Sequence, residues 1–110
     1  MTGTGLRYAL IFARRAGVVP SSDVVAAHQE RLSQLARSGH VAMAGPFEGG
    51  GGLVVLDVGS HREAEELART DPFVLHATHE FRLVRWLQDL GPVAVPAGPS
   101  PVSPADAAGG

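Results

Sequence analysis

Residues 6–13 (LRYALIFA) and residues 23–39 (DVVAAHQERLSQLARSG) decide the fold class of this chain. The first stretch is rich in the branched and aromatic residues that favour β-strands. The second has the apolar spacing of an amphipathic helix, which Asp23 or a serine just before it can cap and Gly39 can end. A strand followed closely by such a helix predicts a sheet covered by helices.

The elements beyond this pair extend the pattern. Ser60 and Glu63 have the capping-box spacing that starts a helix, and Asp71 ends it because a residue before proline avoids helical dihedral angles. Gly49–Gly52 predicts a flexible hairpin connection. The remaining predicted strands are residues 40–46, 53–58 and 79–88, so the full order is β-α-β-β-α-β.

That order predicts an α+β, ferredoxin-like fold, with a four-stranded antiparallel sheet and both helices on one face. A sheet with one face in water alternates apolar and polar side chains. Here both faces are apolar: in the first strand Leu10 and Phe12 oppose Ala9 and Ile11. Two short helices cover only one face, so we expect the other to pack on the same face of a second copy, giving a homodimer joined sheet to sheet.

Composition limits the classes of protein to consider. The chain has 110 residues, of which 45% are hydrophobic, and its mean hydropathy is +0.09, which predicts one globular domain. No apolar run approaches the roughly 20 residues that cross a membrane, and no leader pattern occurs, so we expect a cytoplasmic protein. The net charge of −2 favours no nucleic acid partner. We expect residues 1–90 to form the domain and residues 91–110 a disordered tail without chemistry.

Two missing residue types narrow the chemistry further. The sequence has no cysteine and no lysine, which excludes thiolate nucleophiles and Schiff-base catalysis. Proton transfer, charge stabilisation by arginine and metal binding remain. His28, His76 and His79 raise the question of a three-histidine zinc site. The i, i+3 spacing of the last two at a helix-to-strand transition need not place them on one face, so we expect no metal. Solvated side chains are the plainer expectation for both.

His28 lies where the predicted helix needs an apolar residue, four after Val24 and four before Leu32. A buried imidazole needs a hydrogen-bond partner, and Asp71 is the best candidate. An imidazole held by a carboxylate in an apolar cleft can act as a general acid or base. Two plainer interpretations stay open: His28 bonded to a backbone carbonyl, and Asp71 as the N-cap of a helix that begins at Pro72. The cap and the pairing are compatible, since a carboxylate has two oxygens.

Five features occur in a characteristic order: His28 within AAHQERL, Gly39 at the helix end, Ala44-Gly45-Pro46, Asp71-Pro72-Phe73, and Trp86 in the last strand. This ordered set resembles the YCII-related (YciI-like) family over roughly residues 6–88. The resemblance implies a dimeric α+β barrel and a site centred on His28 and Asp71. It also implies cofactor-free lyase or isomerase chemistry on small cyclic or aromatic substrates. The chain departs from the family at its glycine run, at His76 and His79, and in its tail.

We therefore expect a small cofactor-independent enzyme. His28, oriented by Asp71, would transfer a proton in a lyase, isomerase or cyclase reaction on a small cyclic or aromatic metabolite of catabolism or secondary metabolism. Two alternatives remain: a non-catalytic dimeric module that binds a small molecule or supports a partner enzyme, and a cofactor-free oxygenase. The candidate substrate-binding residues are Tyr8 and Phe47 as pocket walls, Arg15 (with Arg7 and Arg14 nearby) for an anionic group, and His76 and His79.

Overall fold

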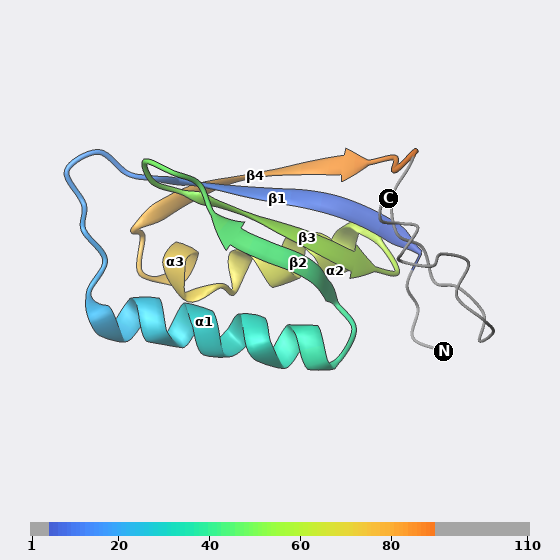
Figure 1. Ribbon diagram of the computed structural model, residues 1–110, viewed down its shortest axis with the longest axis horizontal. Helices are drawn as coiled ribbons and strands as arrows, with labels where there is room; N and C mark the ends of the chain where they lie inside the picture. Colours follow the sequence, from blue (N-terminus) through green and yellow to red (C-terminus); the bar gives the residue numbers. More distant parts are fainter. Residues whose placement is uncertain (1–4, 90–110) are drawn as a thin grey trace, which may run out of the picture.

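The computed structural model describes residues 5–89 and confirms the α+β, ferredoxin-like fold. The four strands form one antiparallel sheet in the order β2-β3-β1-β4 (Figure 1). The predicted tail, residues 91–110, lies outside the described residues. The elements are β1 (Leu6–Arg14), α1 (Ser22–Arg37), β2 (Val41–Pro46), β3 (Gly52–Val58), α2 (His61–Arg69), α3 (Pro72–Leu75) and β4 (His79–Trp86).

The helices begin and end at capping residues that the sequence indicates. At the start of α1, the Ser21 hydroxyl accepts a backbone N–H of the first turn at 3.2 Å, and Gly39 follows the helix with φ +88°. At the start of α2, the Ser60 hydroxyl accepts the N–H of Glu63 at 3.1 Å. The Glu63 carboxylate accepts the N–H of Gly59, one residue before the position in a standard capping box. None of the described helices has the length and apolar composition needed to cross a membrane.

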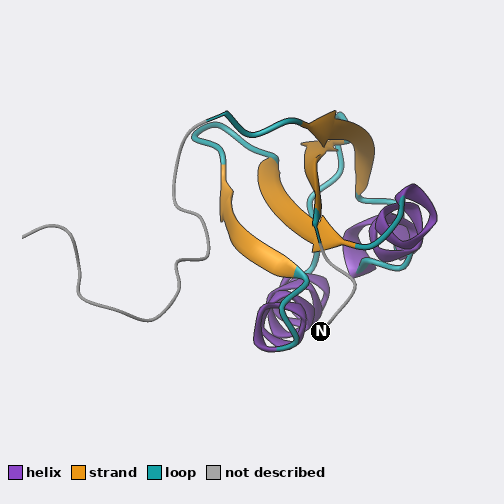
Figure 2. Ribbon diagram, turned by 90° about the vertical axis from the view of Figure 1, so that its right-hand side faces the viewer, coloured by secondary structure: helices purple, strands orange, loops and turns teal. Residues whose placement is uncertain are grey.

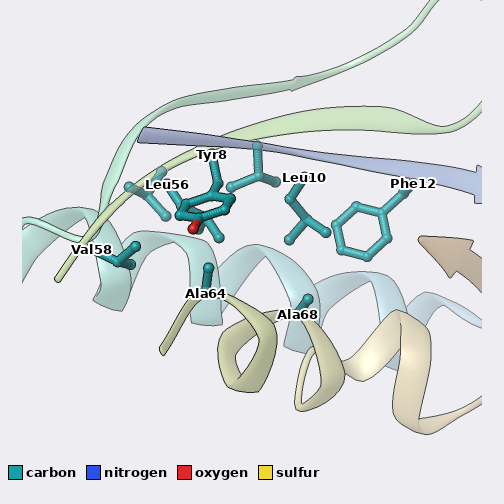
Figure 3. Close-up of a cluster of buried hydrophobic side chains, with 9 residues drawn as sticks. Tyr8, Leu10, Phe12, Leu56, Val58, Ala64 and Ala68 are labelled. Atoms are coloured by element: carbon teal, nitrogen blue, oxygen red, sulfur yellow. The ribbon is translucent and has the colours of Figure 1, made fainter. Parts of the chain in front are cut away.

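The core lies between the sheet and the helices, all of which are on one face of the sheet (Figures 1 and 2). Alternate residues of β1 and β3 point into it, as strand periodicity requires. Ala64 and Ala68 have no exposed surface, so α2 packs closely against the strands (Figure 3). The buried apolar cluster comprises Tyr8, Leu10, Phe12, Val41, Val54, Leu56, Val58, Ala64 and Ala68.

The other face of the sheet is also apolar. Ala9 of β1 is paired with Val55 of β3 and Val84 of β4 on this face. Met43, Val84 and Trp86 are 51%, 38% and 38% exposed. The described helices lie on the opposite face of the sheet (Figure 1). The centre of this face is therefore apolar, as the sequence predicts, whereas Arg7, Asp57, Glu80 and Arg82 add charged side chains to the same face.

Candidate active site

His28 is the buried residue of α1, and it contacts an acid 43 positions away in the sequence. Its Nδ1 lies 2.9 Å from both carboxylate oxygens of Asp71. His28 is 9% exposed and Asp71 is 3% exposed. An ionised carboxylate only accepts hydrogen bonds, so the hydrogen on Nδ1 points at Asp71 and Nε2 is left for other partners.

Asp71 also begins a helix. It is the N-cap of α3, and its Oδ1 accepts the backbone N–H of Phe73 at 2.8 Å. Pro72 occupies the first helical position, where its missing N–H costs nothing. One carboxylate therefore holds both the first turn of α3 and the His28 ring.

Phe73 is stacked between two imidazoles. The His28 ring lies 3.8 Å from the Phe73 ring, centroid to centroid, at an interplanar angle of 13°. The His79 ring lies 4.0 Å from Phe73 at 16°, on the opposite face, because two rings cannot share one face at these distances. Phe12 meets all three rings edge-on, at 5.7–6.1 Å. Such offset and edge-on contacts are the favourable aromatic geometries, and they fix the orientation of both imidazoles.

A cavity of about 440 Å³ opens beside this stack. Its walls are the end of β1, one side of α1, β2 and the hairpin that joins β2 to β3. This volume is in the range of small-molecule sites, which are mostly apolar with a few polar groups. His28, Phe73 and His79 line the cavity, and Asp71 lies behind His28. Among the described residues of the lining, Arg14 alone carries a fixed charge.

The glycine run of the hairpin is explained by its close approach to β1. Gly51 has φ +76°, and a Cβ at this position would lie 2.3 Å from the carbonyl oxygen of Phe12. Only glycine fits both the dihedral angle and the space. The backbone from Gly50 to Gly52 consequently forms part of the cavity wall.

The surroundings of His79 favour its neutral form. Its pKa lies below the ordinary value, mainly because burial disfavours the charged form. The positive charges of His28 and Arg14 lower this pKa further, and the carboxylate of Asp71 acts in the opposite direction. The Nδ1 of His79 lies 2.8 Å from the hydroxyl of Thr78.

Three of the predicted site residues line this cavity. His28 and His79 do so from the two sides of Phe73, and Phe47 does so from the hairpin, with a 44% exposed side chain. Asp71 joins them through its contact with His28. His79 is 5% exposed, so the plainer expectation of a solvated side chain is wrong for this residue.

Three other predicted substrate-binding residues lie away from the cavity. Tyr8 is 5% exposed and packs in the core, because β1 carries it toward α2 rather than toward the hairpin. Arg15 follows the last residue of β1, and its guanidinium lies 3.4 Å from the carboxylate of Glu80. His76 is the exposed C-cap of α3, one turn beyond Phe73.

Two arginines need a separate account: Arg14, which the sequence offered only as a neighbour of Arg15, and Arg31, which was not singled out from the sequence and lies outside the cavity lining. Arg14 shares the strand parity of Phe12, so the alternation of β1 was the signal that separates it from Arg15. Arg31 lies three residues after His28 on α1 and donates hydrogen bonds to the Leu67 carbonyl at 3.0 Å and to the Thr70 hydroxyl at 2.6 Å. These bonds join α1 to the end of α2, directly before Asp71. Helical spacing from His28 was the signal for Arg31.

A model of the YCII-related domain matches residues 6–87. The chain belongs to the YCII-related domain family. This YCII-related chain is 35% identical to the uncharacterized protein YjpA of Bacillus subtilis (strain 168) over 67 residues, which are 60% of the chain and 79% of YjpA. Within the described residues, no three His, Cys, Asp or Glu side chains of the YCII-related domain gather closely enough to hold a metal ion.

The fold of this YCII-related chain is also similar to that of a solved enzyme structure. That enzyme is 5-chloro-2-hydroxyhydroquinone dehydrochlorinase (TftG) from Burkholderia phenoliruptrix AC1100, in complex with 2,5-dihydroxybenzoquinone. The TM-score is 0.64 with 20% sequence identity, over 76% of this chain and 95% of TftG. At this identity the similarity is one of fold.

Proposed function

We propose that this chain is a small cofactor-independent enzyme that transfers a proton with His28 and Asp71. The observation that carries the proposal is the His28 ring: a buried carboxylate holds its Nδ1, and the residue lines a cavity of about 440 Å³. The substrate class is a small cyclic or aromatic metabolite, which the apolar walls and the 2,5-dihydroxybenzoquinone bound by TftG both support. A cytoplasmic location remains part of the proposal.

The chemistry follows from the two ends of the imidazole. Nε2 of His28 takes a proton from a carbon or hydroxyl of the bound ring or, when His28 is protonated, gives one to it. The Asp71 carboxylate compensates the positive charge on His28 in either direction. The Phe73 N–H and the stacked Phe73 ring keep the acid and the imidazole in place during the transfer. The anion left on the substrate then expels a leaving group, cyclises or is reprotonated at another atom. These outcomes correspond to lyase, cyclase and isomerase reactions.

The test compares binding with turnover. Wild type, His28→Gln and the matched control His76→Gln are titrated with 2,5-dihydroxybenzoquinone, and turnover is screened with hydroxylated benzoquinones, halogenated hydroquinones and unsaturated lactones. We expect His28→Gln to bind the quinone within a few-fold of wild type and to lose at least about 100-fold in kcat/KM. His76→Gln should behave as wild type, because His76 is exposed and lies outside the cavity.

Each other result favours a different function. Full turnover by His28→Gln contradicts the proposal. Tight binding without turnover of any compound favours the non-catalytic module, and oxygen uptake during turnover favours the cofactor-free oxygenase.

We further propose that the chain acts as a homodimer joined through the sheet face that carries Met43, Val84 and Trp86. Support comes from the exposure of these three side chains on the face opposite the described helices (Figure 1). Sedimentation equilibrium of Val84→Asp should give a monomer, because the dimer would bury an unpaired charge. The matched control Val19→Asp changes a valine that is 79% exposed in a loop, and it should stay dimeric. A monomeric wild type contradicts the proposal.

A further inference from the structure

The polar residues that the described chain buries all gather at one place. They are His28, Asp71, Thr78 and His79, each 9% exposed or less. His28 and Asp71 account for half of this set. Thr78 and His79 form a second hydrogen-bonded pair on the other face of Phe73, and His79 lines the same cavity as His28. A second buried imidazole at the cavity needs an explanation, because a buried polar side chain costs free energy unless it is satisfied or used.

The tautomer of His79 depends on which of two acceptors the Thr78 hydroxyl donates to. Its Oγ1 lies 3.2 Å from the carbonyl oxygen of Phe73 and 2.8 Å from the Nδ1 of His79. A hydroxyl has a single hydrogen, and a carbonyl can only accept. When Thr78 donates to Phe73, the second contact is a hydrogen bond only if Nδ1 of His79 donates to Oγ1. His79 then has its hydrogen on Nδ1 and a lone pair on Nε2.

With Thr78 donating to Phe73, the two imidazoles share one hydrogen-bonding pattern but differ in charge environment. Each has Nδ1 held from behind, by Asp71 for His28 and by Thr78 for His79, and neither Nε2 has a partner among residues 5–89. His28 touches a carboxylate that compensates a positive charge. His79 touches a neutral hydroxyl and faces Arg14 of β1 and His28 of α1, so burial and these charges lower its pKa against the weaker effect of Asp71.

We propose that His79 is a second catalytic group, which accepts a proton from the substrate through Nε2 while protonated His28 donates one. This inference rests on the proposed function. In an elimination, the substrate C–H proton goes to Nε2 of His79, and its electron pair forms the new C=C bond. The leaving group departs with the electron pair of its own bond and takes the Nε2 proton of His28. In an isomerisation that proton goes to a second carbon instead. No electrons are gained or lost, and exchange with water restores both rings.

Phe73 sets the spacing of this arrangement. Its ring separates the donor and the acceptor, so the two Nε2 atoms meet different atoms of one bound substrate. Thr78 is a positioning residue, because it acts on the substrate only through the tautomer of His79.

The first experiment requires no substrate. Long-range ¹H–¹⁵N correlation spectra of histidine-labelled protein, recorded from pH 5 to 9, report the tautomer and the titration of each ring. We expect neutral His79 with its hydrogen on Nδ1, with a pKa below the ordinary histidine value. Thr78→Val should move His79 toward the Nε2–H tautomer. The matched control Ser38→Ala removes an equivalent contact, the one between Ser38 Oγ and Nδ1 of His40 at 2.9 Å, and should leave His79 unchanged. A wild-type His79 with its hydrogen on Nε2, or with a pKa at or above the ordinary histidine value, overturns the inference.

The second experiment uses a compound that the wild-type protein turns over. A donor and an acceptor produce a bell-shaped dependence of kcat/KM on pH. His79→Gln should lose about 100-fold or more in kcat and abolish the acidic limb of this profile, with the Kd for 2,5-dihydroxybenzoquinone within a few-fold of wild type. Thr78→Val should shift the acidic limb, which a purely structural role would not do.

The outcomes separate this inference from the function on which it rests. If His28→Gln abolishes turnover and His79→Gln keeps both limbs of the pH profile, only the role of His79 is wrong. If the wild type turns over none of the compounds, or His28→Gln turns over as wild type does, both proposals fall.

Discussion

Asp71 accepts hydrogen bonds from two partners, His28 and the Phe73 N–H. Replacing it with asparagine distinguishes the contribution of one bond from that of the other. Asparagine and aspartate are equally good N-caps, so Asp71→Asn keeps the bond to the Phe73 N–H that begins α3. The substitution changes the acceptor for His28 from a carboxylate to an amide. Asp71→Ala removes both interactions.

The expected sizes follow from burial and charge. The His28–Asp71 contact joins two side chains that are 9% and 3% exposed, at 2.9 Å to both oxygens. Hydrogen bonds to charged groups contribute about 1.5–3 kcal/mol, and an N-cap contributes about 1 kcal/mol. An amide acceptor keeps a neutral bond of about 0.5–1.5 kcal/mol, so we expect Asp71→Asn to lower the free energy of unfolding by about 1–1.5 kcal/mol. Asp71→Ala also loses that bond and the cap, and should lower it by about 1.5–2.5 kcal/mol more.

Urea denaturation at pH 7, at one fixed protomer concentration, measures these differences. Ser21→Ala is the matched control, because Ser21 caps α1 at an exposed position and its loss should cost about 1 kcal/mol. An Asp71→Asn protein within about 0.5 kcal/mol of wild type would refute the charge-assisted bond to His28, since that is the usual size of a neutral surface change. Equal losses in the Asn and Ala variants would refute the separate cap.

Three further predictions concern stability. The pKa of His79 is lowered in the folded chain, so the unfolded chain takes up a proton on this residue first as the pH falls below about 6.5. The free energy of unfolding of the wild type should therefore fall between pH 7 and 5 more steeply than that of His79→Gln, as urea titrations would show. Gly51→Ala should lower the free energy of unfolding by about 1–3 kcal/mol, because its Cβ would meet the Phe12 carbonyl; Gly50→Ala, whose Cβ meets nothing within 4 Å, should cost less, as thermal unfolding would show. Arg31→Met should cost about 1.5–3 kcal/mol in urea denaturation, since it removes two hydrogen bonds from a guanidinium to the end of α2; a loss below about 0.5 kcal/mol contradicts this.

Part of the candidate site could be predicted because two residues stand out in the local sequence pattern. His28 interrupts an apolar helical stripe, and a polar residue at such a register needs a buried partner. Asp71 precedes proline and an apolar pair, which indicates an N-cap at the buried end of an element. The two residues are 43 positions apart, and the contact between them follows once both helices pack on the same face of the sheet.

Other site residues could not be assigned in this way. Arg14 and Arg15 are adjacent, and strand alternation places them on opposite faces of the sheet. Which face carries the cavity depends on where the helices pack, and that directs Arg14 to the cavity and Arg15 to Glu80. Tyr8 has the parity of Phe12 but lies four residues earlier, in the core beneath α2, and it does not line the cavity beside His28. The position along β1 decides why Phe12 lines the cavity and Tyr8 does not. Sequence periodicity predicts only which face of the sheet a side chain lies on.

The sequence by itself determined the order of strands and helices, their caps and the two apolar faces of the sheet. Caps, turns and side-chain periodicity depend on neighbours within a few positions, so they can be predicted without knowledge of the fold. Only the tertiary structure decided that His79 stacks on Phe73 opposite His28. The rings come from α1, α3 and β4, and their contact depends on how three separate elements pack around Phe12.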